Sequence, residues 1–498
     1  MQLRHFIFPI MVLLAALNGP AIAQEAREQR PQGSAAASIF DLIPSDSVTE
    51  HVLKTASGDL PYTATAGTLD LFGQAGDRNA KIFYTAYTAD DGGPDRPITF
   101  AFNGGPGAAS AYLHLGLVGP RIVELGPDQN DGTTPRLKDN PHTWLAFTDL
   151  VLVDPVGTGW SRAVGGDAAR GFYGVRQDAE SLAKFIALYT QKNSRLSSPK
   201  YLLGESYGGF RAAKVASALK DAQGILVSGI VMVSPMIDGR FLSGADEDPT
   251  IAALYLPSFA AAELERKGMF TRERAAEAER FAMTDYLVSL AGPTPTGAVG
   301  ELFYARVSEL TGLPRESVAQ ARGFVGALYA KQSSGEGRVV SPYDAGQSTV
   351  DAYPEQVDTH NDDSILDGYT RTYGAAFASY ARDELRFRTE MTYTLLNGEA
   401  NRRWEWNGGR SNASASGDLR DLLSVIPSFR LLVLHGYSDI LTPYGTSRYV
   451  LDHLPLALGE GRTGLKVYRG GHMFYTNPSS RQHASDDART FYCGATVN

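Results

Sequence analysis

Five residues, Gly204-Glu205-Ser206-Tyr207-Gly208, place a serine between two glycines, after the apolar run 201–203 and before a helical pattern that begins near Phe210. A strand–turn–helix of this kind lifts a serine hydroxyl off a sheet, where a base and a substrate carbonyl can both reach it. We therefore predict Ser206 as the nucleophile of an acyl-transfer reaction. The alternative is a surface turn, because this spacing also arises by chance in a chain with 52 glycines.

A second glycine-rich loop has the properties of an oxyanion hole. The buried-strand pattern 98–102 runs into Asn103-Gly104-Gly105-Pro106-Gly107, whose backbone N–H groups are not shielded by side chains. Such N–H groups stabilise the negative oxygen that develops during acyl transfer. An ordinary Pro/Gly turn is the alternative interpretation of the loop.

Two further strand patterns end in a candidate acid and a candidate base. The run 431–434 is followed by His435-Gly436-Tyr437-Ser438-Asp439, and the run 465–468 leads into Arg469-Gly470-Gly471-His472. The chain order is therefore Ser206, Asp439, His472, which is the order of the α/β-hydrolase fold.

Two rival residues fit these roles less well. His435 precedes Asp439 by only four residues, so Asp439 and Ser206 could not easily lie on opposite sides of its imidazole. We interpret His435 as a structural loop residue. Asp154 also ends a strand pattern, but it precedes Ser206, which is the wrong order for this fold. The other histidines lie in the leader or lack a glycine-rich setting after a strand.

Five blocks of the chain together resemble the serine carboxypeptidase family. They occur in the family's order and span most of the chain after residue 98, and they are residues 102–107, 154–161, 204–209, 436–439 and 471–473. The resemblance implies an acid-active exopeptidase that removes single residues from peptide C-termini through an acyl-enzyme. It also implies Ser206 as nucleophile, His472 as base, Asp439 as the acid that orients it, and the backbone N–H groups of Gly105 and Tyr207 as the oxyanion hole.

The same resemblance implies that Asn103 and Glu205 bind the terminal carboxylate of the substrate. Two carboxyl groups can share a hydrogen bond only when one is protonated, since two carboxylates repel and lack a donor. Glu205 therefore predicts better binding of a peptide acid at acidic pH. The alternative is a buried acid favoured by the dipole at a helix start.

Three positions depart from the family pattern. The family usually carries a second acid before the Gly-Pro that follows the glycine-rich loop, and Leu117 stands there in this chain. Ala101 replaces an aromatic residue and Ala108 replaces a disulfide cysteine. Because Leu117 replaces this acid, an esterase, an acyltransferase or another peptidase on the same scaffold is an alternative function. A catalytically silent binding protein is a further alternative, which the complete set of Ser, Asp, His and oxyanion loop disfavours.

Composition narrows the remaining possibilities. The chain has 46 Lys and Arg against 55 Asp and Glu, and this negative balance argues against nucleic acid or an anionic membrane surface as a partner. The single cysteine, Cys493, cannot form an internal disulfide, which favours a bacterial form over the disulfide-rich eukaryotic carboxypeptidases. No H-E-x-x-H motif or cysteine cluster is present, so we predict no metal and no cofactor, with a peptide as the partner.

The N-terminus carries the pattern of a cleavable signal peptide over residues 1–23. Arg4 precedes the apolar stretch 6–17, and Ala21-Ile22-Ala23 supplies small residues before Gln24. A membrane anchor is the alternative, but the apolar stretch is short for a spanning helix. We therefore predict export to the periplasm or the medium.

The domain organisation follows from these motifs. We predict an α/β fold of the α/β-hydrolase type, with a mostly parallel central sheet flanked by helices and an inserted, largely helical cap. The predicted segments are a flexible N-terminus at 24–44, core parts at 45–236 and 426–498, and the cap at 237–425. The sequence predicts neither the oligomeric state nor the residue preferred at the scissile bond.

Overall fold

The computed structural model describes residues 38–55, 58–124, 133–165, 168–356 and 363–494. The predicted leader, residues 1–23, lies outside the described residues, as do residues 24–37 of the predicted N-terminal segment. From Ile39 onward the chain forms one unit, which begins with the 3₁₀ turn η1 (Ile39–Leu42), where Phe40 is buried.

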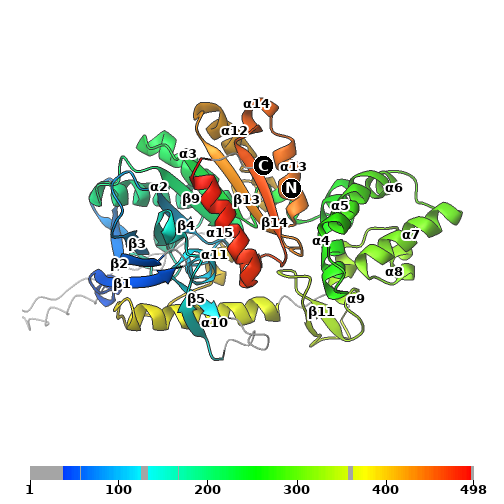
Figure 1. Ribbon diagram of the computed structural model, residues 1–498, viewed down its shortest axis with the longest axis horizontal. Helices are drawn as coiled ribbons and strands as arrows, with labels where there is room; N and C mark the ends of the chain where they lie inside the picture. Colours follow the sequence, from blue (N-terminus) through cyan, green and yellow to red (C-terminus); the bar gives the residue numbers. More distant parts are fainter. Residues whose placement is uncertain (1–37, 56–57, 125–132, 166–167, 357–362, 495–498) are drawn as a thin grey trace, which may run out of the picture. The chain divides into compact units, whose positions relative to one another are not determined.

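A ten-stranded sheet forms the centre of the described part of the chain, in the order β1-β2-β3-β7-β4-β9-β10-β13-β14, with β8 paired to β3 (Figure 1). Its strands are β1 (Ser47–Thr55), β2 (Gly58–Phe72), β3 (Arg78–Ala89), β4 (Ile98–Phe102), β7 (Asp149–Val153), β8 (Arg162–Ala163), β9 (Lys200–Glu205), β10 (Gly229–Val233), β13 (Arg430–Gly436) and β14 (Thr463–Tyr468). β1, β2, β3 and β7 pair antiparallel in succession, and every pair from β7 to β14 is parallel. The predicted mostly parallel sheet is confirmed.

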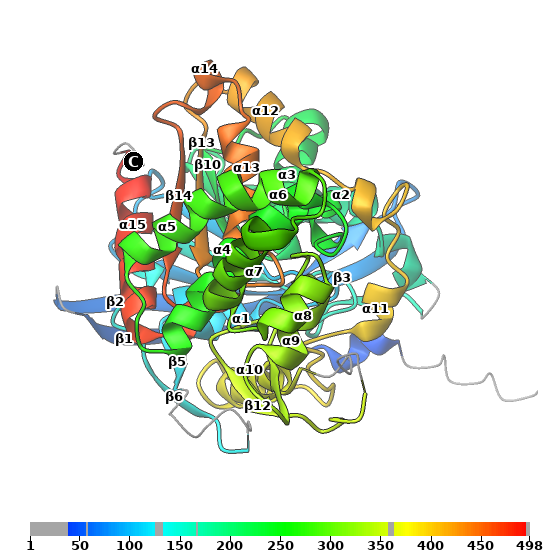
Figure 2. The ribbon, with the colours of Figure 1, turned by 90° about the vertical axis from the view of Figure 1, so that its right-hand side faces the viewer.

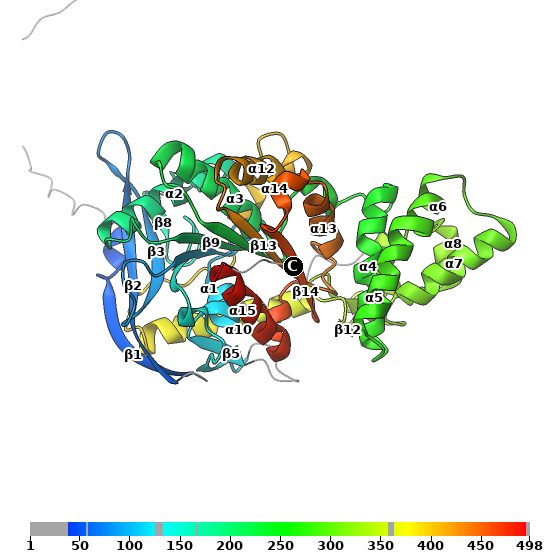
Figure 3. The same ribbon diagram turned by 45° about the horizontal axis from the view of Figure 1, so that its top comes forward.

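Helices cover both faces of this sheet, as continuous burial of its parallel strands requires. Every residue of β4, β7, β9 and β10 is buried, and successive residues of one strand belong to different cores. Leu202 packs in one core with α2 (Val175–Lys192), α3 (Tyr207–Ala218) and α12 (Ser416–Val425). Leu203 packs in the other core with α10 (Ser364–Asp383) and α15 (Pro478–Tyr492), on the opposite side of the sheet in Figure 3.

The segment between β10 and β13 is built from two kinds of structure. Residues 249–350, here called the helical insert, have a hydrophobic core of their own, whereas α10 and α12 pack on the central sheet. The insert faces the viewer in Figure 2 and comprises α4 (Pro249–Arg266), α5 (Arg272–Phe281), α6 (Leu287–Ala291), α7 (Gly297–Thr311), α8 (Arg315–Gln320), α9 (Gly326–Gln332), β11 (Arg338–Val340) and β12 (Ser348–Val350). The predicted cap boundaries at 237 and 425 stay predictions.

Shorter elements complete the connections. These are α1 (Ala111–Leu113), η2 (His114–Val118), the hairpin of β5 (Arg121–Glu124) and β6 (Arg136–Asp139), η3 (Trp144–Ala146), η4 (Ala168–Phe172), η5 (Leu219–Gln223), η6 (Gly239–Leu242), η7 (Ala282–Tyr286), α11 (Gly398–Arg402), η8 (Arg410–Asn412), α13 (Tyr444–Asp452), α14 (Leu456–Gly459) and η9 (Phe474–Thr476). Of the helices that the structure describes, none is both long and apolar enough to cross a membrane.

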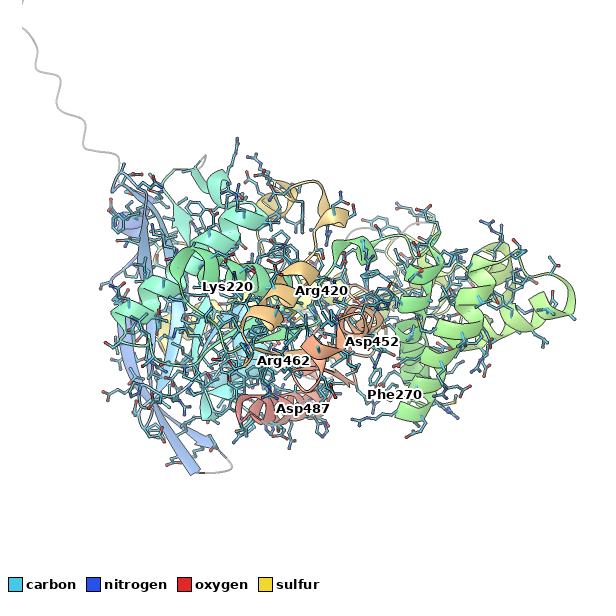
Figure 4. The ribbon with its side chains drawn as sticks, turned by 90° about the horizontal axis from the view of Figure 1, so that it is seen from above. Lys220, Phe270, Arg420, Asp452, Arg462 and Asp487 are labelled. Carbon is cyan, nitrogen blue, oxygen red and sulfur yellow. The ribbon has the colours of Figure 1, made fainter. Side chains whose placement is uncertain are left out.

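Specific contacts join the helical insert to the loops that follow β13 and β14. Glu265 of α4 pairs with Arg469, with 2.7 Å between Oε1 and Nε. The ring of Phe270, labelled in Figure 4, lies 4.9 Å from that of Tyr437. The N–H of Ala345 donates to the carbonyl oxygen of Ser438 at 2.9 Å. The insert is therefore attached beside the loops that carry Asp439 and His472.

A buried ion pair ties two helices to the loop after β4. Arg211 of α3 and Asp178 of α2 are 1% and 3% exposed, and Arg211 Nε lies 2.7 Å from Asp178 Oδ2. Arg211 also donates from Nη1 to the carbonyl oxygen of Asn103. Because the guanidinium has no access to water, it depends on these partners for its hydrogen bonds.

We expect Asp178→Ala to lower the free energy of unfolding by about 3–5 kcal/mol, because it leaves the buried Arg211 charge uncompensated. Glu180→Ala on the same helix is the control. It removes the exposed i,i+4 pair with Arg176 and should cost no more than about 0.5 kcal/mol. Urea unfolding of both variants at neutral pH makes the comparison, and equal losses would contradict the prediction.

Candidate active site

Ser206 lies on a strained turn between β9 and α3. Its φ of 60° and ψ of −126° are unusual for a residue with a side chain. Three hydrogen bonds hold the turn: Ser206 N–H donates to Val233 at 2.9 Å, and its carbonyl oxygen accepts from Gly209 at 3.0 Å and Met236 at 3.1 Å. A Cβ at Gly204 would lie 1.8 Å from the carbonyl oxygen of Gly208, so the turn requires glycine there. The predicted strand–turn–helix is present.

The glycine-rich loop after β4 runs directly against this turn. A Cβ at Gly104 would lie 2.7 Å from both the backbone carbonyl oxygen of Glu205 and the backbone nitrogen of Tyr207, and 2.8 Å from Ser206 Cβ. Gly104 and Gly105 line one pocket together with Ser206. The structure thus brings both predicted oxyanion residues, Gly105 and Tyr207, next to Ser206.

Asp439 and His472 form a buried hydrogen-bonded pair at the ends of β13 and β14. Asp439 Oδ2 lies 2.9 Å from His472 Nδ1. Asp439 Oδ1 accepts from the N–H groups of Leu441 at 2.9 Å and Thr442 at 3.0 Å, which fixes the carboxylate. With a proton on Nδ1 donated to Asp439, Nε2 of the imidazole is left to act as a base. His472 also lines the pocket that contains Ser206.

The protonation of His472 depends on two carboxyl groups. Burial lowers the pKa of His472, but the charge and hydrogen bond of Asp439 and the charge of Glu205 outweigh burial, so its pKa lies above 6.5. The imidazolium that forms when a serine is deprotonated is stabilised by the same charges.

His435 and Asp154, the two rivals, have structural contacts. Nε2 of His435 lies 2.8 Å from Ser447 Oγ, and burial lowers the pKa of His435 to about 4. Asp154 Oδ1 accepts from both the N–H and the hydroxyl of Ser110 at 2.8 Å, which braces the segment before α1. Neither residue belongs to the lining of the pocket with Ser206.

Glu205 and Asn103 meet inside the same pocket. Glu205 is 3% exposed, and its Oε2 accepts from Asn103 Nδ2. Asn103 Oδ1 accepts from the N–H of Leu113 at 3.1 Å, which orients the amide. Burial raises the pKa of Glu205 to about 7, although His472 and the hydrogen-bond donors act to lower it. A neutral carboxyl group is therefore available beside Ser206 at acidic pH.

The structure adds residues that the sequence did not indicate. The hydroxyl of Tyr475 donates to Glu205, and the ring of Tyr343 lies 5.1 Å from the His472 imidazole at an angle of 81°. The carbonyl oxygen of Tyr343 also accepts a hydrogen bond from the backbone N–H of His472 at 2.5 Å. Tyr475 could have been considered because it follows His472 by three residues, but Tyr343 lies in the helical insert, and no sequence signal connects it with the site.

Leu117 does not take part in the pocket. Its side chain is fully buried in the hydrophobic core beneath η2, and its carbonyl oxygen accepts from Asn140 Nδ2 at 3.0 Å. The remaining pocket wall comes from other residues, namely Ala108, Tyr112, Leu366, Leu396 and Met473. In the part of the chain that the structure describes, no group of His, Cys, Asp and Glu side chains could hold a metal ion.

Comparisons with known proteins find similarity to serine carboxypeptidases. A model of the family described as "Serine carboxypeptidase" matches residues 60–280. "Serine carboxypeptidase-like 44" of Arabidopsis thaliana is 28% identical over 163 residues, which is 32% of each chain. "Pheromone-processing carboxypeptidase KEX1" of Yarrowia lipolytica is 28% identical over 211 residues, 41% of this chain and 32% of the relative. The matched segments span about a third of the length of these curated relatives.

The crystal structure of the prohormone-processing carboxypeptidase KEX1 from Saccharomyces cerevisiae has a similar fold. The TM-score is 0.54 at 16% identity, and the superposition covers 87% of this chain and 94% of that one. The predicted α/β-hydrolase fold is therefore confirmed. The family model and the eukaryotic relatives thus show that part of this chain is similar to serine carboxypeptidases.

Proposed function

We propose that this protein is a serine-type carboxypeptidase that hydrolyses the last peptide bond of a substrate through an acyl-enzyme on Ser206. The observation that carries the proposal is a single pocket lined by Ser206, His472, Glu205 and Asn103. A nucleophile and base stand there beside a carboxyl–amide pair suited to a carboxylate. Such a pair within reach of the nucleophile restricts cleavage to the end of a chain.

The proposed reaction follows the logic of a catalytic triad. Ser206 Oγ attacks the scissile carbonyl while His472 Nε2 takes its proton, and Asp439 holds the imidazole in the required tautomer. The N–H groups of Gly105 and Tyr207 stabilise the resulting oxyanion. His472 then passes the proton to the departing amine, which carries the former C-terminal residue, and water hydrolyses the ester on Ser206.

The pair of Asn103 and Glu205 supplies the proposed carboxylate specificity. Asn103 Nδ2 is a donor at every pH, whereas Glu205 can donate only when protonated. A buried anionic Glu205 would repel a substrate carboxylate. Peptide acids are therefore expected to bind best below the pKa of Glu205, which is the basis of the proposed preference for acidic pH.

An esterase, an acyltransferase or another acyl hydrolase is the second candidate. The specific observation in its favour is Leu117, which stands where the family carries a second acid and is buried away from the pocket. The triad and oxyanion loop serve acyl transfer from an ester equally well. The two candidates differ in whether a free carboxylate on the substrate raises kcat/KM.

We further propose that the enzyme is a bacterial protein that is exported to the periplasm or the medium. It acts on peptides after residues 1–23 have been removed. The leader pattern in residues 1–23 and the single cysteine support this proposal. N-terminal sequencing of the protein recovered from the periplasm or the medium is expected to begin at Gln24. Recovery only from the cytoplasm, with residues 1–23 attached, would refute it.

Ser206→Ala is expected to abolish covalent labelling by a fluorophosphonate probe and to lower kcat by roughly 10⁴–10⁶-fold, because the nucleophile is gone. Asp439→Asn should lower kcat by about 10⁴-fold with the fold intact, because the imidazole takes the wrong tautomer. Ser217→Ala, on the same helix α3 but bonded to Asp418, is the control and should retain both properties. Labelling that survives in Ser206→Ala would rule out this nucleophile.

The ratio of kcat/KM for an N-blocked dipeptide acid to that for its amide is expected to fall as pH rises through about 7, the pKa of Glu205. Above the pKa the fall approaches about tenfold per pH unit. The ratio removes the contribution of His472, which both substrates share. In Glu205→Gln the carboxamide donates at every pH, so the ratio should not change with pH. A wild-type ratio that is constant or below one would favour the second candidate.

A further inference from the structure

Tyr475 is placed to control the carboxyl group of Glu205. Its hydroxyl lies 2.8 Å from Glu205 Oε1 and 3.0 Å from Oε2, and the tyrosine is fully buried. The residue lies in η9, and Arg481 Nη1 donates to its carbonyl oxygen at 3.0 Å. Glu205 is thus held by hydrogen bonds from both Tyr475 and Asn103.

The ring of Tyr475 fills the space beside the segment that carries Leu117. A Cβ at Gly116 would lie 2.5 Å from Tyr475 Cε2 and 2.9 Å from the hydroxyl of Tyr373. No room is left there for a larger side chain, and Leu117 itself is buried in the core. The ring of Tyr475 therefore packs directly against the backbone next to Leu117.

The groups that face Glu205 come from several elements. His472 and Asp439 lie on the triad side, and Tyr112 of α1, Tyr373 of α10 and Tyr343 of the helical insert lie within electrostatic range. Asp439 is bonded to His472. Among the described residues, the side chains that form hydrogen bonds with Glu205 are those of Asn103 and Tyr475. Neither of these is a carboxyl group.

We propose that Tyr475 is a specificity-determining residue of the carboxylate-binding site, and that its hydroxyl is the fixed neutral donor that positions Glu205. The inference rests on the proposed carboxypeptidase function. A pair of acids can hold two protons, one or none, whereas Glu205 with a phenol has one titrating proton. The pH dependence of carboxylate recognition then comes from Glu205 alone.

The hydroxyl of Tyr475 favours the ionised form of Glu205. Burial raises the pKa of Tyr475 well above its usual value, so the hydroxyl is a donor throughout the working pH range. A hydrogen bond donated to a carboxylate favours its ionised form and lowers its pKa. Removal of the hydroxyl therefore keeps Glu205 protonated to higher pH, while the carboxyl group loses its orientation. The first consequence shifts the pH profile of the acid-to-amide ratio of kcat/KM, and the second raises KM for the peptide acid.

The test is Tyr475→Phe in the full chain, which keeps the ring over Gly116. The acid-to-amide ratio of kcat/KM should fall at a pH about one unit higher than in the wild type. KM for the peptide acid at low pH should rise several-fold, because Glu205 is less well oriented. kcat/KM for the amide should fall less than kcat/KM for the acid, since the amide offers no carboxylate to Glu205.

Tyr444→Phe is the matched control, because the hydroxyl of Tyr444 donates to Glu279 Oε1 at 2.8 Å outside the pocket lining. It removes the same kind of bond and should leave the pH profile of the ratio unchanged. In a Glu205→Gln background, Tyr475→Phe should produce no pH shift, since the titrating group is absent.

The outcomes separate this inference from the proposed function. A wild type that prefers the peptide acid, with a Tyr475→Phe variant whose ratio profile is unchanged, would overturn the role of Tyr475 and leave the carboxypeptidase assignment standing. Equal losses on both substrates would also overturn it, because they indicate a purely structural role. A wild type with no preference for the acid would overturn both proposals.

Discussion

The close approach of two backbone segments is the constraint on which the rest of the site depends. β4 and β9 are parallel neighbours, and the loops at their carboxyl ends pass each other with no space for a side chain at Gly104 or Gly208. This contact brings the first loop against Ser206, which has a positive φ. Hydrogen bonds with Val233, Gly209 and Met236 hold the strained turn, and the buried Arg211 holds the first loop through the carbonyl oxygen of Asn103.

Electrostatics inside the pocket is set by the proximity of one base to two acids. Asp439 is hydrogen-bonded to His472, and Glu205 raises the pKa of the same imidazole through its charge. Protonation of Glu205 removes its negative charge and so lowers the pKa of His472. The two groups therefore titrate as a coupled pair. The carboxylate-recognition group and the catalytic base are therefore linked in any dependence of rate on pH.

The helical insert contributes to the site as well as covering part of the molecule. The backbone carbonyl oxygen of Tyr343 accepts a hydrogen bond from the backbone N–H of His472, and the ring of Tyr343 lies against the imidazole. The ion pair of Glu265 with Arg469 attaches α4 three residues before that histidine. Because a wall of the pocket and the support of the base come from the same insert, changes in the insert would affect both access to the site and the geometry of His472.

The sequence by itself determined the local chemistry: the turn around Ser206, the glycine-rich loop, and the order of Ser206, Asp439 and His472 at strand ends. These follow from short-range rules, since a glycine pattern and an apolar run specify backbone shape over a few residues. Tertiary structure alone decided that Tyr475 holds Glu205, that Tyr343 reaches His472, and that the segment between β10 and β13 divides between the helical insert and the sheet faces. The reason is physical: which side chains meet across hundreds of residues depends on how helices pack on the sheet, and packing is a property of the whole core.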